Sequence, residues 1–173
     1  EVVGIATKSS SSFNSDHSDL SDLAVKYKIP YKYVRDINAP QIIDWIESLR
    51  SDVIFCLGWS SLIKENILNI PKKGVIGYHP AELPHNKGRH PQIWAMVLGL
   101  EKTASTFFLM DQGADTGEII SQSEIKIEFE DNAKSVYDKL IKTAKVQLLE
   151  LLIKLNNGSL TKISQDKNAG NHW

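Results

Sequence analysis

Short apolar runs of strand length recur along the chain. Two of them, EVVGIATK at residues 1–8 and DVIFCLGW at residues 52–59, have the short, continuous apolar character of strands that are buried on both faces of a parallel sheet. Other runs of the same kind predict further strands. They are YKYV after Pro30, GVIGY at 74–78, ASTFFLM at 104–110 and GEIISQSEIKI at 117–127.

Amphipathic segments lie between these runs, with apolar residues three to four positions apart. Helices are predicted at 19–27, at 39–50, from Ser60 to about Leu68 and from about His90 to Leu98. Pro40 suits a first helical turn, and Gly158 is placed to cap a long final helix. The predicted buried face of that final helix consists of Val136, Leu140, Ala144, Leu148, Leu151 and Leu155.

The alternation of strands and helices predicts an α/β fold with an open, mostly parallel sheet and helices on both of its faces. In such sheets, ligands bind at the carboxyl ends of the strands, where the connecting loops gather. Three loops are therefore candidates for a site. They begin at Gly58, at His79 and at Asp111.

Composition narrows the class of protein. The chain has 173 residues, 42% of them apolar, and a formal net charge of -1, as expected for one globular domain. No basic block suggests a dedicated nucleic-acid binder, and no apolar run approaches the roughly 20 residues of a membrane span. The single Cys56 excludes an internal disulfide and fits a small core residue in a reducing cytoplasm.

The tripeptide Asp115-Thr116-Gly117 also occurs at the active site of aspartic proteases, but those enzymes are all-β, and the alternating pattern argues against that class. His79, His85 and His90 match no familiar zinc spacing, so no metal site is expected. Dinucleotide-binding, phosphate-loop and nucleophile-elbow motifs are missing as well.

Two longer stretches carry a resemblance to a known family. HPAELPHNKGRHPQIWAMVLGL at 79–100 and TASTFFLMDQGADTGEIISQ at 103–122 resemble the catalytic domain of formyltransferases that use 10-formyltetrahydrofolate. Methionyl-tRNA formyltransferase, glycinamide ribonucleotide transformylase and the sugar N-formyltransferases belong to this family. The likeness covers roughly residues 1–155 and implies a Rossmann-like domain that transfers a formyl group from the folate carrier to a primary amine.

The resemblance implies that His79 and Asp115 are catalytic. Formyl transfer needs a group that moves a proton near neutral pH, which suits histidine, and a nearby carboxylate would orient the ring and help move the proton. One position departs from the family pattern, because Gly77 stands where the family usually has an asparagine that polarises the formyl oxygen. Asn86 or a backbone N–H could replace this amide, activity could be weakened, or the domain could bind without turnover.

The resemblance also suggests where the substrates bind. The folate carrier is expected between the loop at residues 59–62 and the loop that begins at Asp111. Small residues in the second loop would let its backbone approach the pterin ring. These positions are Trp59, Ser60, Ser61 and Leu62 in the first loop, and Asp111, Gly113 and Ala114 in the second. The loop across the mouth is expected to receive the acceptor through Asn86, Lys87, Arg89 and His90.

The acceptor is expected to be a nucleotide-linked amino sugar. Members that act on tRNA carry a basic insertion, whereas the matching stretch here has Asp16, Asp19 and Asp22 against Lys8, and this charge would repel phosphates. No nucleic-acid or membrane partner is expected, with tRNA as the runner-up acceptor. A homodimer is kept as an option for assembly.

The ends of the chain complete the sequence-based interpretation. The family normally begins with a strand and a helix before the segment that corresponds to EVVGIATK, so this sheet is expected to lack them. Residues 1–157 would form the catalytic domain, and residues 158–173 a linker toward a C-terminal domain. Two other functions stay open: a formyltetrahydrofolate hydrolase that uses the same His and Asp on water, and a noncatalytic folate- or nucleotide-binding homologue.

Overall fold

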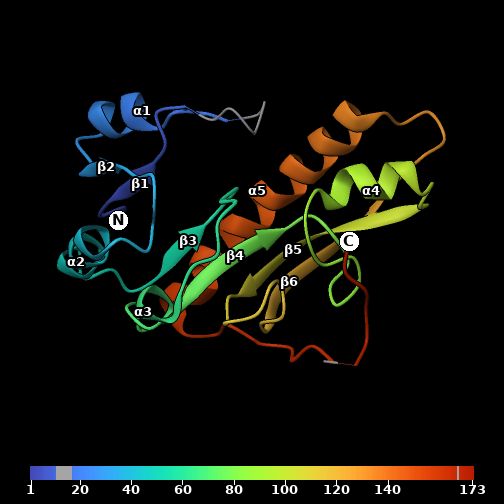
Figure 1. Cartoon of the computed structure of the whole chain (residues 1–173). Coiled ribbons are helices and arrows are strands. Elements are labelled where there is room, and N and C mark those ends of the chain that lie inside the picture. Colours follow the sequence, from blue (N-terminus) through green and yellow to red (C-terminus); the bar gives the residue numbers. More distant parts are fainter. Residues whose placement is uncertain (11–16, 167) are drawn as a thin grey trace. The chain divides into compact units, whose positions relative to one another are not determined.

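The computed structural model describes residues 1–10, 17–166 and 168–173, and these residues form two compact units (Figure 1). The first unit consists of residues 1–52 and 63–72, and the second of residues 53–62 and 73–173. The elements of the first unit are β1 (Ile5–Thr7), α1 (Ser21–Lys26), β2 (Tyr31–Tyr33), α2 (Pro40–Ser48) and α3 (Glu65–Leu68). Those of the second are β3 (Ile54–Cys56), β4 (Val75–His79), α4 (Pro91–Val97), β5 (Lys102–Leu109), β6 (Ile119–Lys126) and α5 (Ala133–Asn157).

In the first unit, α1 connects two short parallel strands. β1 and β2 pair in parallel from Ile5 opposite Tyr31, and α1 buries Ala24 completely. α2 begins with Pro40 at its first turn, as the sequence predicts, and buries Ile42 and Ile46 on one face. This unit is therefore a small βαβ arrangement, which is what the apolar periodicity indicates.

Helix α3 is shorter than the sequence predicts. The periodicity suggests a helix from Ser60, but the helix begins at Glu65. The backbone N–H of Lys64 donates to the side chain of Asn38 at 2.9 Å, and Lys64 has an extended conformation. The expectation for residues 60–64 was therefore wrong, because a tertiary hydrogen bond fixes the extended residue from which the helix starts.

The second unit contains a four-stranded sheet in the order β3-β4-β5-β6. β3 and β4 are parallel, whereas β4–β5 and β5–β6 are antiparallel, with Ile76 opposite Leu109 and His79 opposite Thr106. The α/β class and the strands agree with the prediction, but the sheet is mixed rather than mostly parallel. Apolar periodicity marks a strand without encoding its direction, so the sequence could not predict this.

Helix α5 packs on the sheet of the second unit (Figure 1). An Asn132 and Ser135 capping box begins it, and Gly158, with φ 72°, caps its end as predicted. The side chains that form the shared core are Ile76, Phe107, Ile120, Leu151 and Leu155. Full burial of a side chain such as Leu contributes roughly 1.5–3 kcal/mol, so this contact is a main source of stability for the unit.

One polar residue, Gln147, lies on the buried face of α5 and is only 3% exposed. Its amide donates to the Ser105 carbonyl at 3.1 Å and to the Ser121 hydroxyl at 2.8 Å. Of the predicted face, Val136, Leu140, Leu151 and Leu155 are buried, and Ala144 and Leu148 are half-buried against the same core. In β3, burial of the Cys56 side chain raises the pKa of its thiol to about 12.

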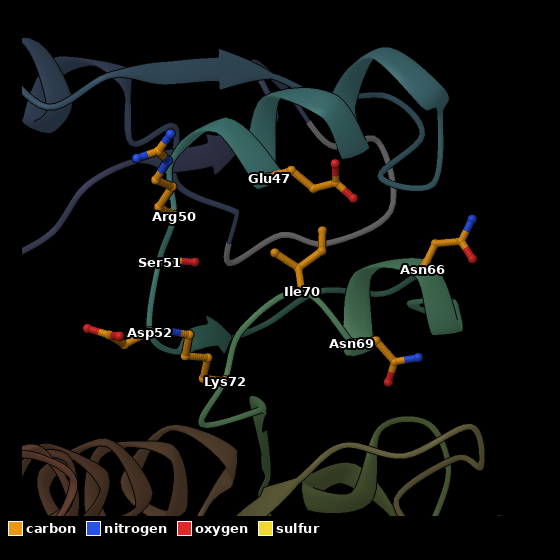
Figure 2. Close-up of a pocket in the computed structure, with 8 residues that line it drawn as sticks. All are labelled: Glu47, Arg50, Ser51, Asp52, Asn66, Asn69, Ile70 and Lys72. Carbon is orange, nitrogen blue, oxygen red and sulfur yellow. The ribbon is translucent and has the colours of Figure 1, made fainter.

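A cleft of about 570 Å³ lies wholly within the first unit (Figure 2). Its lining residues are Glu47, Arg50, Ser51, Asp52, Asn66, Asn69, Ile70 and Lys72. None of the residues that the sequence suggests for a functional site belongs to this set. Across the described residues, no helix is both long and apolar enough to cross a membrane, and no three His, Cys, Asp or Glu side chains gather as metal ligands.

Candidate active site

His79 is the last residue of β4 and is 5% exposed. Its Nε2 lies 2.8 Å from the backbone oxygen of Asn86, and its Nδ1 lies 3.6 Å from Oδ2 of Asp115. The same Asp115 oxygen accepts a 3.0 Å hydrogen bond from the backbone N–H of Gly88. Asp115, which is far from His79 in the sequence, and the loop that follows β4 therefore both contact the buried imidazole of His79.

The loop that carries Asp115 reaches His79 by an unexpected route. Because β5 is antiparallel to β4, the end of β5 lies beside the start of β4, and the N–H of Met110 donates to the carbonyl of Val75. Asp115 nevertheless contacts His79, which is at the other end of β4. The loop therefore runs back along β4 and does not simply gather with other loops at the carboxyl edge of a parallel sheet, as the sequence suggested.

The 111–117 loop is held by its own polar groups. Asp111 Oδ1 accepts from the Gly113 N–H at 3.0 Å and from the Thr116 hydroxyl at 2.6 Å. Gly117 approaches the Leu109 carbonyl so closely that a Cβ would lie 1.6 Å from the oxygen, which only glycine tolerates. Asp115 itself has φ 58°, in the left-handed region. This loop is a specific conformation and not a loose connection.

The loop after β4 has an irregular backbone. Asn86, Gly88 and His90 all have positive φ values, of 60°, 110° and 55°. The structure places Lys87 among the buried residues, at 4% exposure, whereas Arg89 is exposed. Of the predicted acceptor residues, Asn86 therefore lies at the imidazole, and the backbone around Lys87 links the imidazole to the Asp115 carboxylate.

The predicted carrier loop follows β3. Trp59 is half-buried, and Ser60, Ser61 and Leu62 are exposed. In the second predicted carrier loop, Asp111, Gly113 and Ala114 are exposed as well. The side chain of Asp111 already serves the turn, so what this loop presents outward at Gly113 and Ala114 is mainly backbone.

Packing accounts for the glycine at position 77. A Cβ built there would lie 2.8 Å from the ring of Phe108 and 3.0 Å from the side chain of Met110. The first distance is shorter than real Cβ contacts and the second is unusually tight, so any larger residue would require these two side chains to shift. Phe108 and Met110 therefore fill the space that an asparagine side chain would need.

Sequence patterns missed the contribution of the last residues of the chain. Gln165 donates to the carbonyls of Asp115 at 3.0 Å and Gly117 at 2.7 Å. Asn171 accepts from the N–H of Asn86 through its side chain and from that of Lys87 through its backbone, at 2.9 and 3.0 Å. These residues lie in an irregular segment, so no periodicity could have revealed their partners.

Comparison with known proteins identifies the family. The formyl transferase family model matches residues 2–152. Over 123 residues the chain is 37% identical to the bifunctional polymyxin resistance protein ArnA of Wigglesworthia glossinidia brevipalpis, covering 71% of this chain and 19% of that protein. Over 144 residues it is 31% identical to the methionyl-tRNA formyltransferase of Geotalea uraniireducens, covering 83% and 46%. The chain thus spans less than half the length of these curated relatives.

A solved structure supports the fold. The formyltransferase PseJ from Anoxybacillus kamchatkensis, in complex with UDP-4,6-dideoxy-4-formamido-L-AltNAc and tetrahydrofolate, superposes with a TM-score of 0.71. The two chains are 23% identical, and the match covers 98% of this chain and 84% of that one. The match to the family model over most of the chain, together with these relatives, shows that the chain belongs to the formyl transferase family.

Proposed function

We propose that this protein transfers a formyl group from 10-formyltetrahydrofolate to a primary amine, with His79 and Asp115 as catalytic residues. The observation that carries the proposal is the 3.6 Å approach of the His79 imidazole to the Asp115 carboxylate in a chain of this family. The buried ring lies at the end of β4 and the carboxylate lies in a separate loop, and hydrogen bonds to the loop after β4 hold the two together. A positioned acid–base group of this kind contributes typically 10²- to 10⁴-fold to a rate.

The reaction requires one proton to move between two nitrogen atoms. The acceptor amine attacks the formyl carbon, a C–N bond forms, and the carbonyl oxygen becomes an oxyanion. The amine then loses a proton, the bond from the formyl carbon to N10 of the folate breaks, and N10 takes up a proton. His79 relays this proton, and Asp115, facing Nδ1, fixes the orientation of the ring.

The geometry also indicates how substrate reaches the ring. Both nitrogens of His79 face protein groups, Nδ1 toward Asp115 and Nε2 toward the Asn86 carbonyl. Access to Nε2 therefore requires the Asn86 carbonyl to move aside when the substrates bind. The residues with positive φ around it, Gly88 and His90, give this loop a backbone in which a small local change can redirect a carbonyl.

The charge of the developing oxyanion needs a donor, and Gly77 supplies no side chain. We propose that the side-chain amide of Asn86 acts in its place, because its own backbone oxygen already lies 2.8 Å from the imidazole. An asparagine at position 77 would meet Phe108 and Met110. A donor from the neighbouring loop is thus consistent with how this core is packed.

The folate carrier is proposed to bind between residues 59–62 and residues 111–114. Trp59 offers a flat apolar surface, and Gly113 and Ala114 expose backbone groups that suit the polar edge of a pterin ring. The bound carrier supplies the activated formyl group. Residues 59–62 and 111–114 hold and orient the carrier, and the proton that its N10 takes up comes through His79.

A nucleotide-linked amino sugar is the proposed acceptor. Asp19 and Asp22 lie on an exposed stretch before and within α1, and the Ser21 N–H holds the pKa of Asp19 below its usual value, so that it is ionised at neutral pH. Such charge disfavours the phosphates of tRNA. Asp16 of the same stretch lies outside the described residues. The PseJ neighbour, which binds a UDP-linked formamido sugar, supports the same acceptor class.

Methionyl-tRNA is the second candidate acceptor, because curated relatives at 31% identity are methionyl-tRNA formyltransferases. The experiment that separates the two offers the full protein the formyl carrier with a panel of nucleotide-linked amino sugars and with Met-tRNA. Formyl incorporation into a sugar supports the proposal, and incorporation into tRNA alone replaces the sugar by tRNA. Formate release with no acceptor would instead identify a hydrolase.

The chemistry of the site is tested in the same assay with His79→Ala, and the control is His17→Ala in the first unit. Turnover should be lost only in the His79 variant, while carrier binding by equilibrium dialysis stays measurable. Full turnover in His79→Ala would show that the site assignment is wrong. Carrier binding without turnover in the unaltered protein would favour a noncatalytic homologue.

A further inference from the structure

The last residues of the chain pack on both loops of the proposed site. Residues 163–166 and 168–173, here called the C-terminal segment, begin at Ile163 with a two-way backbone pairing to Ile119 at the start of β6. These two hydrogen bonds, of 2.9 and 2.8 Å, anchor the segment directly after the loop that carries Asp115. In Figure 1 the red end of the chain returns to the loop that follows β4.

Gln165 connects this segment to the Asp115 backbone. Its Nε2 donates to the carbonyl oxygens of Asp115 and Gly117, at 3.0 and 2.7 Å. Both partners are acceptors, so only the NH₂ end of the amide fits, and each of its two hydrogens serves one carbonyl. The Asp115 carbonyl belongs to the peptide between Asp115 and Thr116, and the Gly117 carbonyl belongs to the peptide that leaves Gly117. One side chain therefore holds the peptide that directly follows Asp115 and a second peptide two residues further on.

This contact matters because of the backbone that it holds. Asp115 has φ 58°, in the left-handed region, which is uncommon for a residue with a side chain and carries strain. The direction of its carboxylate toward His79 depends on that conformation. The side chain of Gln165 is partly buried. Its Oε1 is buried and has no hydrogen-bond partner among the described residues, so its described hydrogen bonds are those that its NH₂ group donates.

The other end of the C-terminal segment holds the opposite side of the pair. Asn171 accepts from the N–H groups of Asn86 and Lys87, and the Trp173 N–H donates to the Lys87 carbonyl at 2.9 Å. Asn86 supplies the oxygen at His79 Nε2, and Gly88 supplies the N–H at Asp115. The C-terminal segment thus hydrogen-bonds to the backbone of both loops, at Asn86 and Lys87 beside the imidazole and at Asp115 and Gly117 beside the carboxylate.

We propose that Gln165 is a positioning residue for Asp115, and that through it the C-terminal segment sets the geometry of the His79–Asp115 pair. The inference rests on the proposed function, because it assigns a role relative to that pair. Gln165 touches no reacting atom. It acts by holding the left-handed backbone that aims the carboxylate at Nδ1.

The experiment compares, in the full protein, two glutamines that each donate two hydrogen bonds. Gln165→Ala is expected to lower kcat by about 10- to 100-fold with KM changed less than about threefold, since misplacing a catalytic group by 1 Å costs rates of this order. Gln147→Ala is the matched control. That residue also donates two hydrogen bonds and has an Oε1 with no partner in the described part of the chain, but it joins α5 to β5 and β6. It should lower the melting temperature and leave kcat within about twofold.

Gln165→Met separates loss of the two donors from loss of side-chain volume. Met fills the space without donating, so it should reproduce the kcat loss of the Ala variant at a melting temperature no lower than that of the Ala variant. Unchanged kcat in both Gln165 variants, or an equal kcat loss in Gln147→Ala, would overturn the proposal. Loss of kcat in His79→Ala is measured in parallel. If that variant stays active, the proposed site fails, whereas an inactive His79→Ala with active Gln165 variants rejects the positioning role alone.

Discussion

The cleft of the first unit and the His79–Asp115 site of the second unit differ in what their polar groups do. The cleft has a volume of about 570 Å³ and presents Glu47, Arg50, Asp52 and Lys72 (Figure 2). In Figure 2 the side chains of Arg50 and Asp52 point away from that of Asn66, so these three side chains do not converge. Around His79, by contrast, a ring nitrogen, a carboxylate and two backbone groups meet within hydrogen-bonding or ion-pair distance.

We infer from the comparison that the convergence of oriented groups is a better guide to a candidate active site than the volume of a cleft. A buried imidazole flanked by a carboxylate can move a proton, because each partner is held in place. Charged side chains spread over an open cleft are largely solvated and screened, so they carry little energy for a bound molecule. Substitutions at the His79–Asp115 site, beside it and in the cleft test this contrast.

Asp115→Asn removes the charge from the convergent site and keeps its shape. The amide can still accept from the Gly88 N–H, so the loop should keep its conformation. We expect kcat of formyl transfer to fall roughly 10²- to 10⁴-fold, because an uncharged group no longer pairs with the imidazole. Steady-state kinetics measures this, and a melting temperature within a few degrees of the parent shows that the fold survives. Retained kcat would remove the carboxylate from the mechanism.

Gly77→Asn tests whether the packed site tolerates the side chain that the family usually places there. The new Cβ would lie 2.8 Å from the Phe108 ring and 3.0 Å from Met110, so overpacking should destabilise the protein by about 1–3 kcal/mol. Denaturant unfolding measures the loss. Activity should fall as well, since Phe108 lies in β5 opposite Gly77. A variant that is stable and more active would show that a side-chain amide at 77 is the missing donor.

How far the sequence predicted this site depends on the kind of contact. The proximity of His79 and Asp115 was expected from the resemblance to the formyltransferase family that two motifs carry, and the structure places them 3.6 Å apart. The path of the Asp115 loop was not predictable, because it depends on the direction of β5. The roles of Gln147 and Gln165 were also hidden, since a glutamine on an apolar helix face or in an irregular segment gives no sign of the distant carbonyls that it meets.

The fold shows the same division. The apolar face of α5 and its C-terminal end were predicted, because the periodicity and the terminal glycine act within a few residues of each other. The start of α3 was missed, because it depends on Asn38, which is 26 positions from Lys64. Local interactions can thus be derived from the sequence, and tertiary hydrogen bonds cannot.

Asp131 sharpens the comparison, because it is densely bonded without being part of the site. Lys139, the Glu128 N–H and the Ser135 hydroxyl all donate to its carboxylate, and they lower its pKa to about 2, with Lys139 contributing most. A depressed carboxylate pKa stabilises the fold above the unfolded value near 3.8, and this contribution is lost as the pH falls through about 2.

Asp131→Asn should therefore lower the melting temperature at neutral pH, and the difference from the parent should shrink between pH 4 and pH 2. Formyl transfer at neutral pH should stay within about twofold of the parent at temperatures where both are folded. The altered hydrogen bonds join Asp131 only to the turn before α5 and to the first residues of that helix. A kcat loss comparable to that of Asp115→Asn would show that dense bonding around a carboxylate, by itself, does not distinguish the site.

The smallest effect is expected in the cleft. Glu47→Ala and Lys72→Ala each remove one exposed charge from its lining, and exposed substitutions away from packed or bonded groups usually change stability by less than about 0.5 kcal/mol. We expect kcat and KM for both substrates to stay within about twofold, at low and at physiological salt. If either variant instead lowered kcat/KM tenfold while His79→Ala stayed active, the contrast would be reversed: the open cleft would be where the substrates react, and convergence around a buried imidazole would not mark the site.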